Sequence, residues 1–343
     1  MSFLELDGIH TGFIAENRPR ALAAGVDPYE YDRVTAGIGH IREWPDAFIA
    51  AGSARVELGL SGSAASRASA DRAAALLFHF ATVLPDTDEE RRTRATTAAA
   101  SALARALPSA VAVVDEHATE GFRGYLRFPN NVVRESGPVV ILVPGMNSSA
   151  VEFVGVTEVL LRRGLAVLAI DGPGQGACPG RWQPEFERVV GRAIDAVPGA
   201  TSVGVWGMSM GGWLAARAAA YEPRVRALVA VSGPGELRWP ELVPYVTDTF
   251  RRRAGGEEAG KAFAAGVDGA GPASELEVPA LVVEGGKDAI PGVGNLADLA
   301  GKAPRGELVV IPEGNHLVEQ HRHLWLPQAA DWVAEELGAT QTS

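Results

Sequence analysis

Residues 202–213 read SVGVWGMSMGGW, and this stretch decides the fold. The apolar run Ser202 to Trp206 is followed at once by Gly207-Met208-Ser209-Met210-Gly211, and small residues then continue to Tyr221. A Gly-x-Ser-x-Gly pattern between a strand and a helix is typical of a sharp turn that lifts the serine above a sheet. Glycine is needed beside the turn because side chains there would collide. We therefore expect Ser209 to be a nucleophile at a helix N-terminus, where the helix dipole favours negative charge.

The chain after residue 110 alternates short apolar runs with helical stretches, which predicts an α/β fold with a mostly parallel sheet covered on both faces. The predicted strands are Val111 to Asp115, Gly124 to Phe128, Val139 to Val143, Leu165 to Ile170, Ser202 to Trp206, Ala227 to Val231, Ala280 to Glu284 and Leu308 to Ile311. The first two have no helix between them, so we expect an antiparallel hairpin at one edge. We assign residues 109–343 to a catalytic domain, in which the long connection at about 233–277 is expected to form a lid.

The first part of the chain reads as helical. Ala70 to Leu84 places apolar residues at helical spacing, and Trp44 to Ala51 is a further helix candidate. We expect Gly52 and Gly59 to interrupt the chain after Ala51, since glycine weakens a helix. Residues 1–108 are therefore predicted to form an N-terminal helical cap.

A serine hydroxyl is a weak nucleophile until a base takes its proton. We predict His316 as the base, because it lies in the loop after the last predicted strand. The orienting acid is expected after the preceding strand, which predicts Asp288, with Glu284 as the alternative. The order serine, aspartate, histidine fits this arrangement. His316, His321 and His323 lack the spacing of a metal site, so we expect no metal.

Two amide donors are expected to face the oxyanion that forms during attack on a carbonyl. The first is the amide of Met210, directly after the nucleophile. The second should come from the loop after Val139 to Val143, where Met146 is the first candidate and Asn147 the second. That loop lacks the Gly-Lys-Ser/Thr of a nucleotide-binding loop, and we expect no cofactor.

Composition excludes several other classes of protein. The formal net charge of −11 disfavours nucleic acid as a partner, because an acidic surface repels phosphates. The single cysteine, Cys178, leaves no intrachain disulfide and no thiolate metal site. No secretion signal and no apolar run long enough to span a membrane are visible, so we expect a cytoplasmic protein without a membrane partner.

Four segments together resemble a known family: the Gly-x-Ser-x-Gly turn, Asp171-Gly172-Pro173-Gly174-Gln175-Gly176, Pro144 to Glu152, and Phe122 to Leu126. The sequence resembles the α/β hydrolases, in the branch that contains 2,6-dihydroxypseudooxynicotine hydrolase and the fungal polyketide-shortening carbon–carbon hydrolases. The resemblance implies the α/β-hydrolase fold, with an eight-stranded sheet flanked by helices, and a Ser-Asp-His triad under a helical cap. It also implies a lid glutamate, for which Glu241 is the first candidate and Glu236 the second. Some members are dimers, so a homodimer is implied as well.

The expected substrate is a medium-sized, aromatic or polyketide-like small molecule, bound in an apolar pocket to which Trp239 and Tyr245 of the lid contribute. The expected reaction is hydrolysis of a carbon–carbon or ester bond next to a carbonyl group. Elimination of an acyloxy group such as acetate would use the same base and the same oxyanion donors. The sequence therefore does not distinguish a lyase from a hydrolase. A non-catalytic binding protein is the third hypothesis, and the intact serine, histidine and aspartate count against it.

Overall fold

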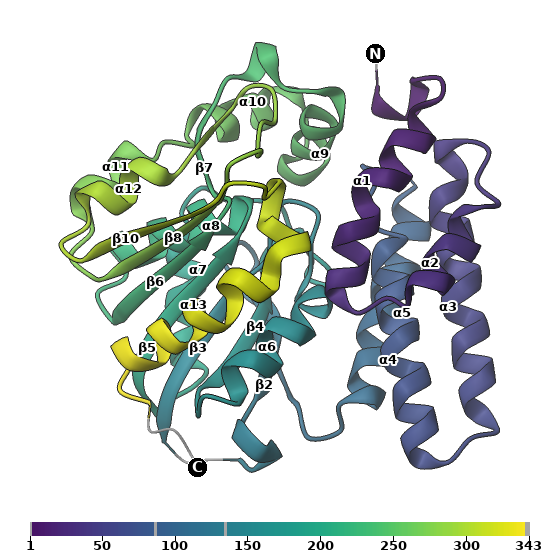
Figure 1. Ribbon diagram of the computed structural model, residues 1–343, viewed down its shortest axis with the longest axis horizontal. Coiled ribbons are helices and arrows are strands. Elements are labelled where there is room, and N and C mark those ends of the chain that lie inside the picture. The colour runs from purple at the N-terminus through teal and green to yellow at the C-terminus, as the bar shows by residue number, and fades with distance from the viewer. Residues whose placement is uncertain (1, 86–87, 134–135, 340–343) are drawn as a thin grey trace.

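The computed structural model describes residues 2–85, 88–133 and 136–339 (Figure 1). Its strands are β1 Val111–Asp115, β2 Phe122–Arg127, β3 Gly137–Val143, β4 Ala166–Asp171, β5 Ala200–Met208, β6 Val225–Val231, β7 Pro234–Leu237, β8 Ala280–Gly285, β9 Val293–Asn295 and β10 Gly306–Ile311. Its α-helices are α1 Ile9–Ala24, α2 Pro28–Thr35, α3 Trp44–Leu60, α4 Ala64–Phe80, α5 Glu89–Ala106, α6 Val154–Leu161, α7 Phe186–Asp195, α8 Met210–Tyr221, α9 Pro244–Ala254, α10 Glu257–Ala265, α11 Ala270–Glu275, α12 Ala297–Lys302 and α13 Arg322–Glu336.

The central sheet has eight strands in the order β1-β2-β4-β3-β5-β6-β8-β10. β1 pairs with β2, and β2 with β4, in antiparallel fashion, whereas every later pair is parallel. The predicted α/β-hydrolase fold is thereby confirmed, as is the predicted hairpin at the sheet edge. The carboxyl ends of the parallel strands lie at one edge, where side chains from separate loops can meet.

Both faces of the sheet are covered because alternate residues of each strand point to opposite sides. Val139 and Ile141 of β3 belong to the core under α7 and α8, together with Trp213. Val140 and Leu142 belong to the opposite core, which packs under α6 and α13. This burial on both faces explains why the inner strands read as continuous apolar runs.

Helices α1 to α5 pack around a second hydrophobic core, to which Val151 and Val154 also contribute, and they stand together at one side of the sheet (Figure 1). Trp44, Phe48 and Phe80 are fully buried in that core, and Trp44 Nε1 donates a hydrogen bond to the Phe80 carbonyl at 2.7 Å. These aromatic residues come from helices, as the sequence predicted for this region. The boundary of a separate cap at residue 108 stays a prediction.

The expectation that glycines end the helix after Ala51 is wrong, because α3 runs unbroken through Gly52 and Gly59. A Cβ at Gly52 would lie 2.8 Å from the Phe78 ring, and one at Gly59 would lie 2.9 Å from Ala70 Cβ. Both glycines therefore allow the close approach of α3 to α4. Glycine stands at these two positions because the helices pack closely there, and not because a helix ends.

The long connection after β6 contains β7, α9, α10 and α11. β7 pairs with β9 as a small antiparallel sheet, which the sequence analysis did not predict. The ring of Tyr245 in α9 lies 5.1 Å from that of Phe3 and 5.6 Å from that of Phe13, centre to centre. The lid segment and the N-terminal helices therefore touch each other above the carboxyl edge of the sheet. None of the helices in the described ranges has the length and apolar character needed to cross a bilayer.

Candidate active site

Ser209 lies in a strained turn between β5 and α8. Its φ of 55° and ψ of −128° are unusual for a residue with a side chain. A Cβ at Gly207 would fall 1.9 Å from the Gly211 carbonyl oxygen, and one at Gly211 would fall 2.2 Å from that of Val143. The flanking glycines are therefore required by the turn itself, and strain of this kind is common at functional sites.

Ser209, His316 and Asp288 form a chain of hydrogen bonds. His316 Nδ1 lies 2.8 Å from Asp288 Oδ2, and His316 Nε2 lies 2.8 Å from Ser209 Oγ. A carboxylate can only accept, so Nδ1 donates to Asp288 and Nε2 is left to accept from the serine hydroxyl. The structure thus brings together three residues that the sequence analysis selected from three separate loops.

Glu284, the alternative orienting acid, makes a different contact. One of its carboxyl oxygens accepts a hydrogen bond from the Leu296 amide at 3.3 Å. Burial raises the pKa of Glu284 to about 8, and the nearby charge of Asp288 adds to the effect. The acid that contacts His316 is Asp288.

The loop after β3 passes directly beside the nucleophile. A Cβ at Gly145 would lie 3.0 Å from Ser209 Cβ and 2.9 Å from the Met208 carbonyl oxygen, so only glycine fits there. Met146 and Met210 line the same cavity as Ser209. Within the part of the chain that the structure describes, the amides of Met146 and Met210 donate no hydrogen bond. Both are therefore available as donors to a bound oxygen atom.

A cavity of about 550 Å³ opens above Ser209. Its walls come from α1, the loop after β3, the lid segment and the loops after β8 and β10, with Arg20, Met146, Val246, Phe250, Ile290 and Glu319 among them. The cavity therefore lies between the N-terminal helices and the carboxyl edge of the sheet, and its size is typical of a small-molecule site.

Tyr245 is the lid residue that connects these walls. Its hydroxyl donates to the Val83 carbonyl at 2.8 Å and accepts from the side-chain amide of Asn147. Burial raises the pKa of Tyr245 to about 12, so the phenol stays neutral. Tyr245 lines the cavity, and its contact with a substrate stays a prediction. Asn147, the second candidate for the oxyanion donor, is held in this contact through its side chain.

The other lid candidates lie elsewhere. Glu236 and Glu241 each pair with Arg238, at 2.6 Å and 3.0 Å, and more than half of each glutamate side chain is exposed. Trp239 packs on the far side of Phe250, with ring centres 6.2 Å apart, and does not line the cavity. None of the three residues lines the cavity above Ser209, and their contact with a ligand stays a prediction. The arginine between the glutamates offers them an ion pair at the surface, which costs less than burying either carboxylate.

A buried polar network joins α1 and α4 to the loop beside Ser209, and the sequence analysis missed it. Arg20 holds both carboxylate oxygens of Glu152, at 2.6 Å and 2.7 Å, and also donates to the Asn147 carbonyl and the Ser148 hydroxyl. Burial alone would raise the pKa of Glu152, but Arg20 and the neighbouring imidazole outweigh it and hold the pKa well below its usual range. The carboxylate is therefore charged.

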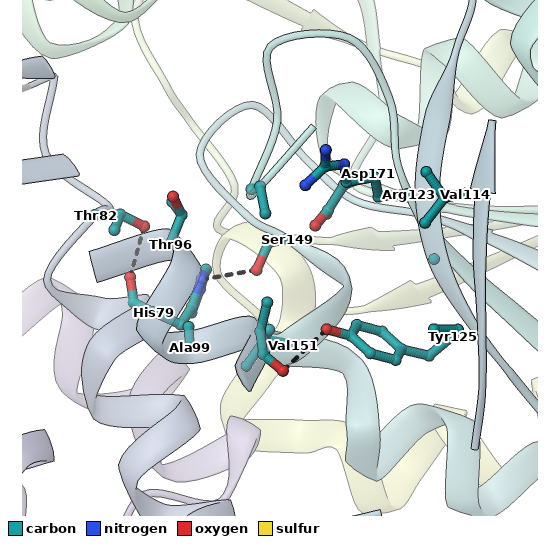
Figure 2. Close-up of a pocket in the computed structure, with 15 residues that line it drawn as sticks. His79, Thr82, Thr96, Ala99, Val114, Arg123, Tyr125, Ser149, Val151 and Asp171 are labelled. Carbon is teal, nitrogen blue, oxygen red and sulfur yellow. Dashed lines mark hydrogen bonds between the residues drawn. The ribbon is translucent and has the colours of Figure 1, made fainter. Parts of the chain in front are cut away.

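His79 of α4 continues this network. Its Nε2 lies 3.0 Å from Glu152 Oε2, and its Nδ1 lies 3.0 Å from the Ser149 hydroxyl (Figure 2). Because the Glu152 carboxylate can only accept, Nε2 donates and Nδ1 accepts from Ser149. The loop after β3 is thus held from the N-terminal helices at Asn147, Ser148 and Ser149.

Figure 2 shows a second, smaller cavity of about 170 Å³ beside this histidine. Asp171 borders it and accepts a hydrogen bond from the Ala150 amide at 2.7 Å. Burial raises the pKa of Asp171 to about 7 against the opposing effect of that amide. Among the described residues no group of three or more His, Cys, Asp or Glu side chains is arranged to hold a metal ion.

The fold and this site define the chain as an α/β-hydrolase-fold protein. The family described as alpha/beta hydrolase fold matches residues 138–261. The solved structure of 2,6-dihydroxy-pseudo-oxynicotine hydrolase superposes with a TM-score of 0.79 at 22% identity, over 95% of this chain and 97% of that chain. This likeness extends over the N-terminal helices as well as the sheet.

Two relatives are similar in sequence over part of their length, and they bear out the resemblance that the motifs indicated. Hydrolase LUC6 of Fusarium sp is 36% identical over 130 residues, which are 34% of this chain and 30% of that protein. The 2,6-dihydropseudooxynicotine hydrolase of Paenarthrobacter nicotinovorans is 27% identical over 215 residues, which are 59% of this chain and 58% of that protein. The chain therefore spans less than two thirds of the length of each relative.

Proposed function

We propose that this protein is a serine hydrolase in which Ser209 is the nucleophile, His316 the base and Asp288 the group that orients the base. One observation carries the proposal: the two 2.8 Å contacts that link serine, histidine and aspartate at the floor of a cavity. The strained turn and the start of α8 support it, because both favour an exposed, activated hydroxyl.

In the proposed reaction His316 Nε2 takes the proton of Ser209 as its oxygen attacks a carbonyl carbon. The amides of Met210 and Met146 stabilise the resulting oxyanion, and one such donor is worth about 3 kcal/mol of transition-state stabilisation. The imidazolium, stabilised by Asp288, then returns the proton to the leaving carbanion or alkoxide. Water, activated by the same histidine, finally releases the acyl group and restores the serine.

We infer that the substrate is a medium-sized ketone or ester and that α1 and α9 act as the cap over it. The cavity of about 550 Å³ and its apolar wall residues, such as Val246 and Phe250, support this size and character. Both relatives are named as hydrolases, which supports hydrolysis. The name 2,6-dihydropseudooxynicotine hydrolase also supports a small molecule as the substrate. We propose that the bond cleaved is a carbon–carbon or an ester bond. That the protein forms a homodimer stays a prediction.

Labelling with a fluorophosphonate tests the proposed nucleophile. We expect intact-protein mass spectrometry to show one adduct, and peptide mapping to place it on Ser209. Ser209→Ala should abolish labelling, and His316→Ala should slow it roughly a thousandfold or more, since a nucleophile and its base act as a unit. Thermal unfolding of each variant controls for folding. Equal labelling of wild type and His316→Ala would contradict the proposal.

Labelled water separates hydrolysis from the elimination that the sequence left open. Turnover of a β-acyloxy ketone in H₂¹⁸O should give a hydroxy ketone and place ¹⁸O in the acid product if an acyl-enzyme is hydrolysed. An unsaturated product that forms without ¹⁸O would favour elimination with His316 as the base. A Ser209→Ala variant that keeps full activity would contradict covalent catalysis.

A further inference from the structure

The strand β10 forms one edge of the large sheet, and its outer side is open. It is the last strand in the order of the sheet and pairs with β8 alone among the described strands (Figure 1). Leu308 is 45% exposed and Val310 is 48% exposed, although both are large apolar residues. An exposed apolar edge strand is a template on which another strand can pair.

The backbone of β10 presents hydrogen-bonding groups on this outer side. The carbonyl groups of Arg305 and Ile311 accept from amides on the β8 side, at 3.3 Å and 2.8 Å. Successive residues of a strand direct their amide and carbonyl groups to alternate sides, so residues 305, 307, 309 and 311 face β8. Leu308 and Val310 therefore direct theirs to the free edge. Among the described residues, neither makes a backbone hydrogen bond outside the sheet.

The sequence of β10 and its flanks is complementary to itself in the antiparallel direction. About a twofold axis at Val309, Leu308 lies opposite Val310 of a second copy, and Arg305 lies opposite Glu313 of that copy. Each Leu308–Val310 pair can exchange two hydrogen bonds, because both residues direct their backbone groups outward. Apolar pairs and pairs of opposite charge across strands both stabilise such a contact.

The charges at the two ends of β10 are exposed and already form ion pairs within the chain. Arg305 pairs with Glu336 of α13, and Glu313 pairs with Lys287 of the loop after β8. More than half of the Arg305 and Glu313 side chains is exposed. A contact between Arg305 and Glu313 of two copies would extend these pairs into a row of alternating charges.

The neighbouring registers that use the same outward groups match less well. An axis at Glu307 would set this carboxylate against its own copy, and an axis at Val310 would set Glu307 against Glu313. Like charges directly opposite each other destabilise a strand pair. An axis at Leu308 would set Arg305 against Ile311. Of these four registers, the one about Val309 brings opposite charges together.

We propose that the open edge of β10 is a homodimer interface, in which the β10 strands of two copies pair antiparallel about Val309 and join the two sheets. The occupant is a second copy because the strand complements itself in charge and in apolar side chains. A symmetric contact of this kind closes on itself, so it gives a dimer and not a fibre. Neither Leu308 nor Val310 lines the cavity above Ser209, and the inference does not depend on the proposed chemistry.

Engineered cysteines test the interface together with its register. Val309 would lie opposite its own copy in a pair without hydrogen bonds, in which the Cα atoms are about 4.5 Å apart, a distance that a disulfide spans. We expect Val309→Cys to form a covalent dimer under mild oxidation, measured by non-reducing electrophoresis and intact mass. Leu308→Cys is the matched control, because its two copies would lie diagonally, about 7–8 Å apart, too far for a disulfide. The natural Cys178 is buried and is present in both variants.

A charge placed at the edge tests the interface without cross-linking. Wild-type protein should sediment as a dimer in a concentration series. Val310→Lys should raise the dimer dissociation constant about tenfold or more, since it replaces both apolar cross-strand contacts with a lysine at the edge. Val111→Lys is the control, because Val111 is similarly exposed on β1, at the opposite edge of the sheet, and it should leave the dimer unchanged.

Several results would overturn the inference. They are a wild type that stays monomeric at the highest concentration reached, a Val310→Lys protein that dimerises like wild type, and a Val309→Cys protein that cross-links no more readily than Leu308→Cys. Thermal unfolding of each variant controls for folding. Fluorophosphonate labelling of Ser209 enters none of these measurements, so the interface and the proposed function fail independently.

Discussion

Among the described residues, burial raises the pKa values of three carboxyl groups well above their usual range. Burial raises the pKa values of Asp171 and Glu319 to about 7 and that of Glu284 to about 8. Each is placed differently: Asp171 accepts an amide hydrogen bond, Glu319 borders the large cavity, and Glu284 lies at the end of β8 beside Asp288. Glu284 is the simplest to test, because it does not contact the cavity.

Glu284→Gln should flatten the pH dependence of stability. The folded-state pKa of about 8 lies above the unfolded value of 4.5, so the folded protein holds the proton more tightly. The free energy of unfolding therefore falls as pH rises through this interval. A neutral amide removes that fall, and we expect the variant to gain about 1–3 kcal/mol relative to wild type between about pH 5 and pH 9. Urea unfolding of both proteins at about pH 5 and about pH 9 measures this change in the free energy of unfolding.

Glu57→Gln is the control, since Glu57 is exposed on α3. Its stability should follow that of the wild type at both pH values. A Glu284→Gln protein whose stability falls with pH as steeply as that of the wild type would show that Glu284 is already ionised in the folded state.

The elements differ in how far sequence predicts them. The inner strands of the large sheet were predicted because they are compact apolar runs that are buried on both faces. α1 contains a proline and has little apolar periodicity, so no local pattern revealed it. β7 contains proline and glycine, β9 is only three residues long and contains glycine, and the two strands pair with each other.

The proposed triad was predictable because each member directly follows a strand, and topology then brings the loops together. Arg20 and Glu152 are 132 positions apart in the chain, and their contact depends on how the N-terminal helices dock. Glu319 reads as an ordinary polar residue of a C-terminal helical stretch until its burial is seen. The lid glutamates were chosen by resemblance, and Arg238 holds both at the surface instead.

The close contact between α3 and α4 can be tested by a substitution at Gly52. Gly52→Ala places a methyl group 2.8 Å from the Phe78 ring, so the helices must move apart. Overpacking typically costs about 1–3 kcal/mol, and the better helix propensity of alanine returns about 1 kcal/mol of it. We expect a net loss of about 1 kcal/mol in the free energy of unfolding, measured by urea titration.

Gly12→Ala in α1 is the matched control, because a Cβ there meets no atom within 4 Å. Helix propensity should then act alone, and the variant should be as stable as wild type or gain up to about 1 kcal/mol. Gly52→Ala behaving like Gly12→Ala would show that α3 and α4 have room to adjust.

At the scale of the whole molecule, the cavity above Ser209 is formed where the N-terminal helices meet the sheet. Polar contacts span this interface: Arg20 with Glu152, Arg322 with the Ala23 carbonyl, and Arg72 with Glu158 at 2.6 Å (compare the positions of α1, α4 and α6 in Figure 1). The Arg20 pair is the buried one, and it also holds the loop that carries a proposed oxyanion donor. Stability and catalysis should therefore be coupled through this residue.

Arg20→Met should lower both stability and activity. Glu152 would keep the hydrogen bond from His79 but lose the guanidinium that holds both of its oxygens, and removing one partner of a buried ion pair typically costs about 3–5 kcal/mol. The loop at Asn147 and Ser148 would also lose its contacts with the guanidinium group, so we expect kcat to fall at least tenfold for an aryl ester, with a smaller change in KM. Arg18→Met on the same helix is the control, because Arg18 pairs with Asp32 at the surface and should cost less than about 1 kcal/mol.

The double variant Arg20→Met/Glu152→Gln separates the two effects. Removing the charge of Glu152 should recover most of the stability, because an apolar side chain beside a neutral amide avoids the cost of a buried ion. It should not restore kcat, since the loop still lacks the guanidinium donors at the Asn147 carbonyl and the Ser148 hydroxyl. Denaturant unfolding and steady-state kinetics on one aryl ester measure both quantities. Recovery of kcat together with stability would mean that Arg20 serves the site only by keeping the N-terminal helices folded against the sheet.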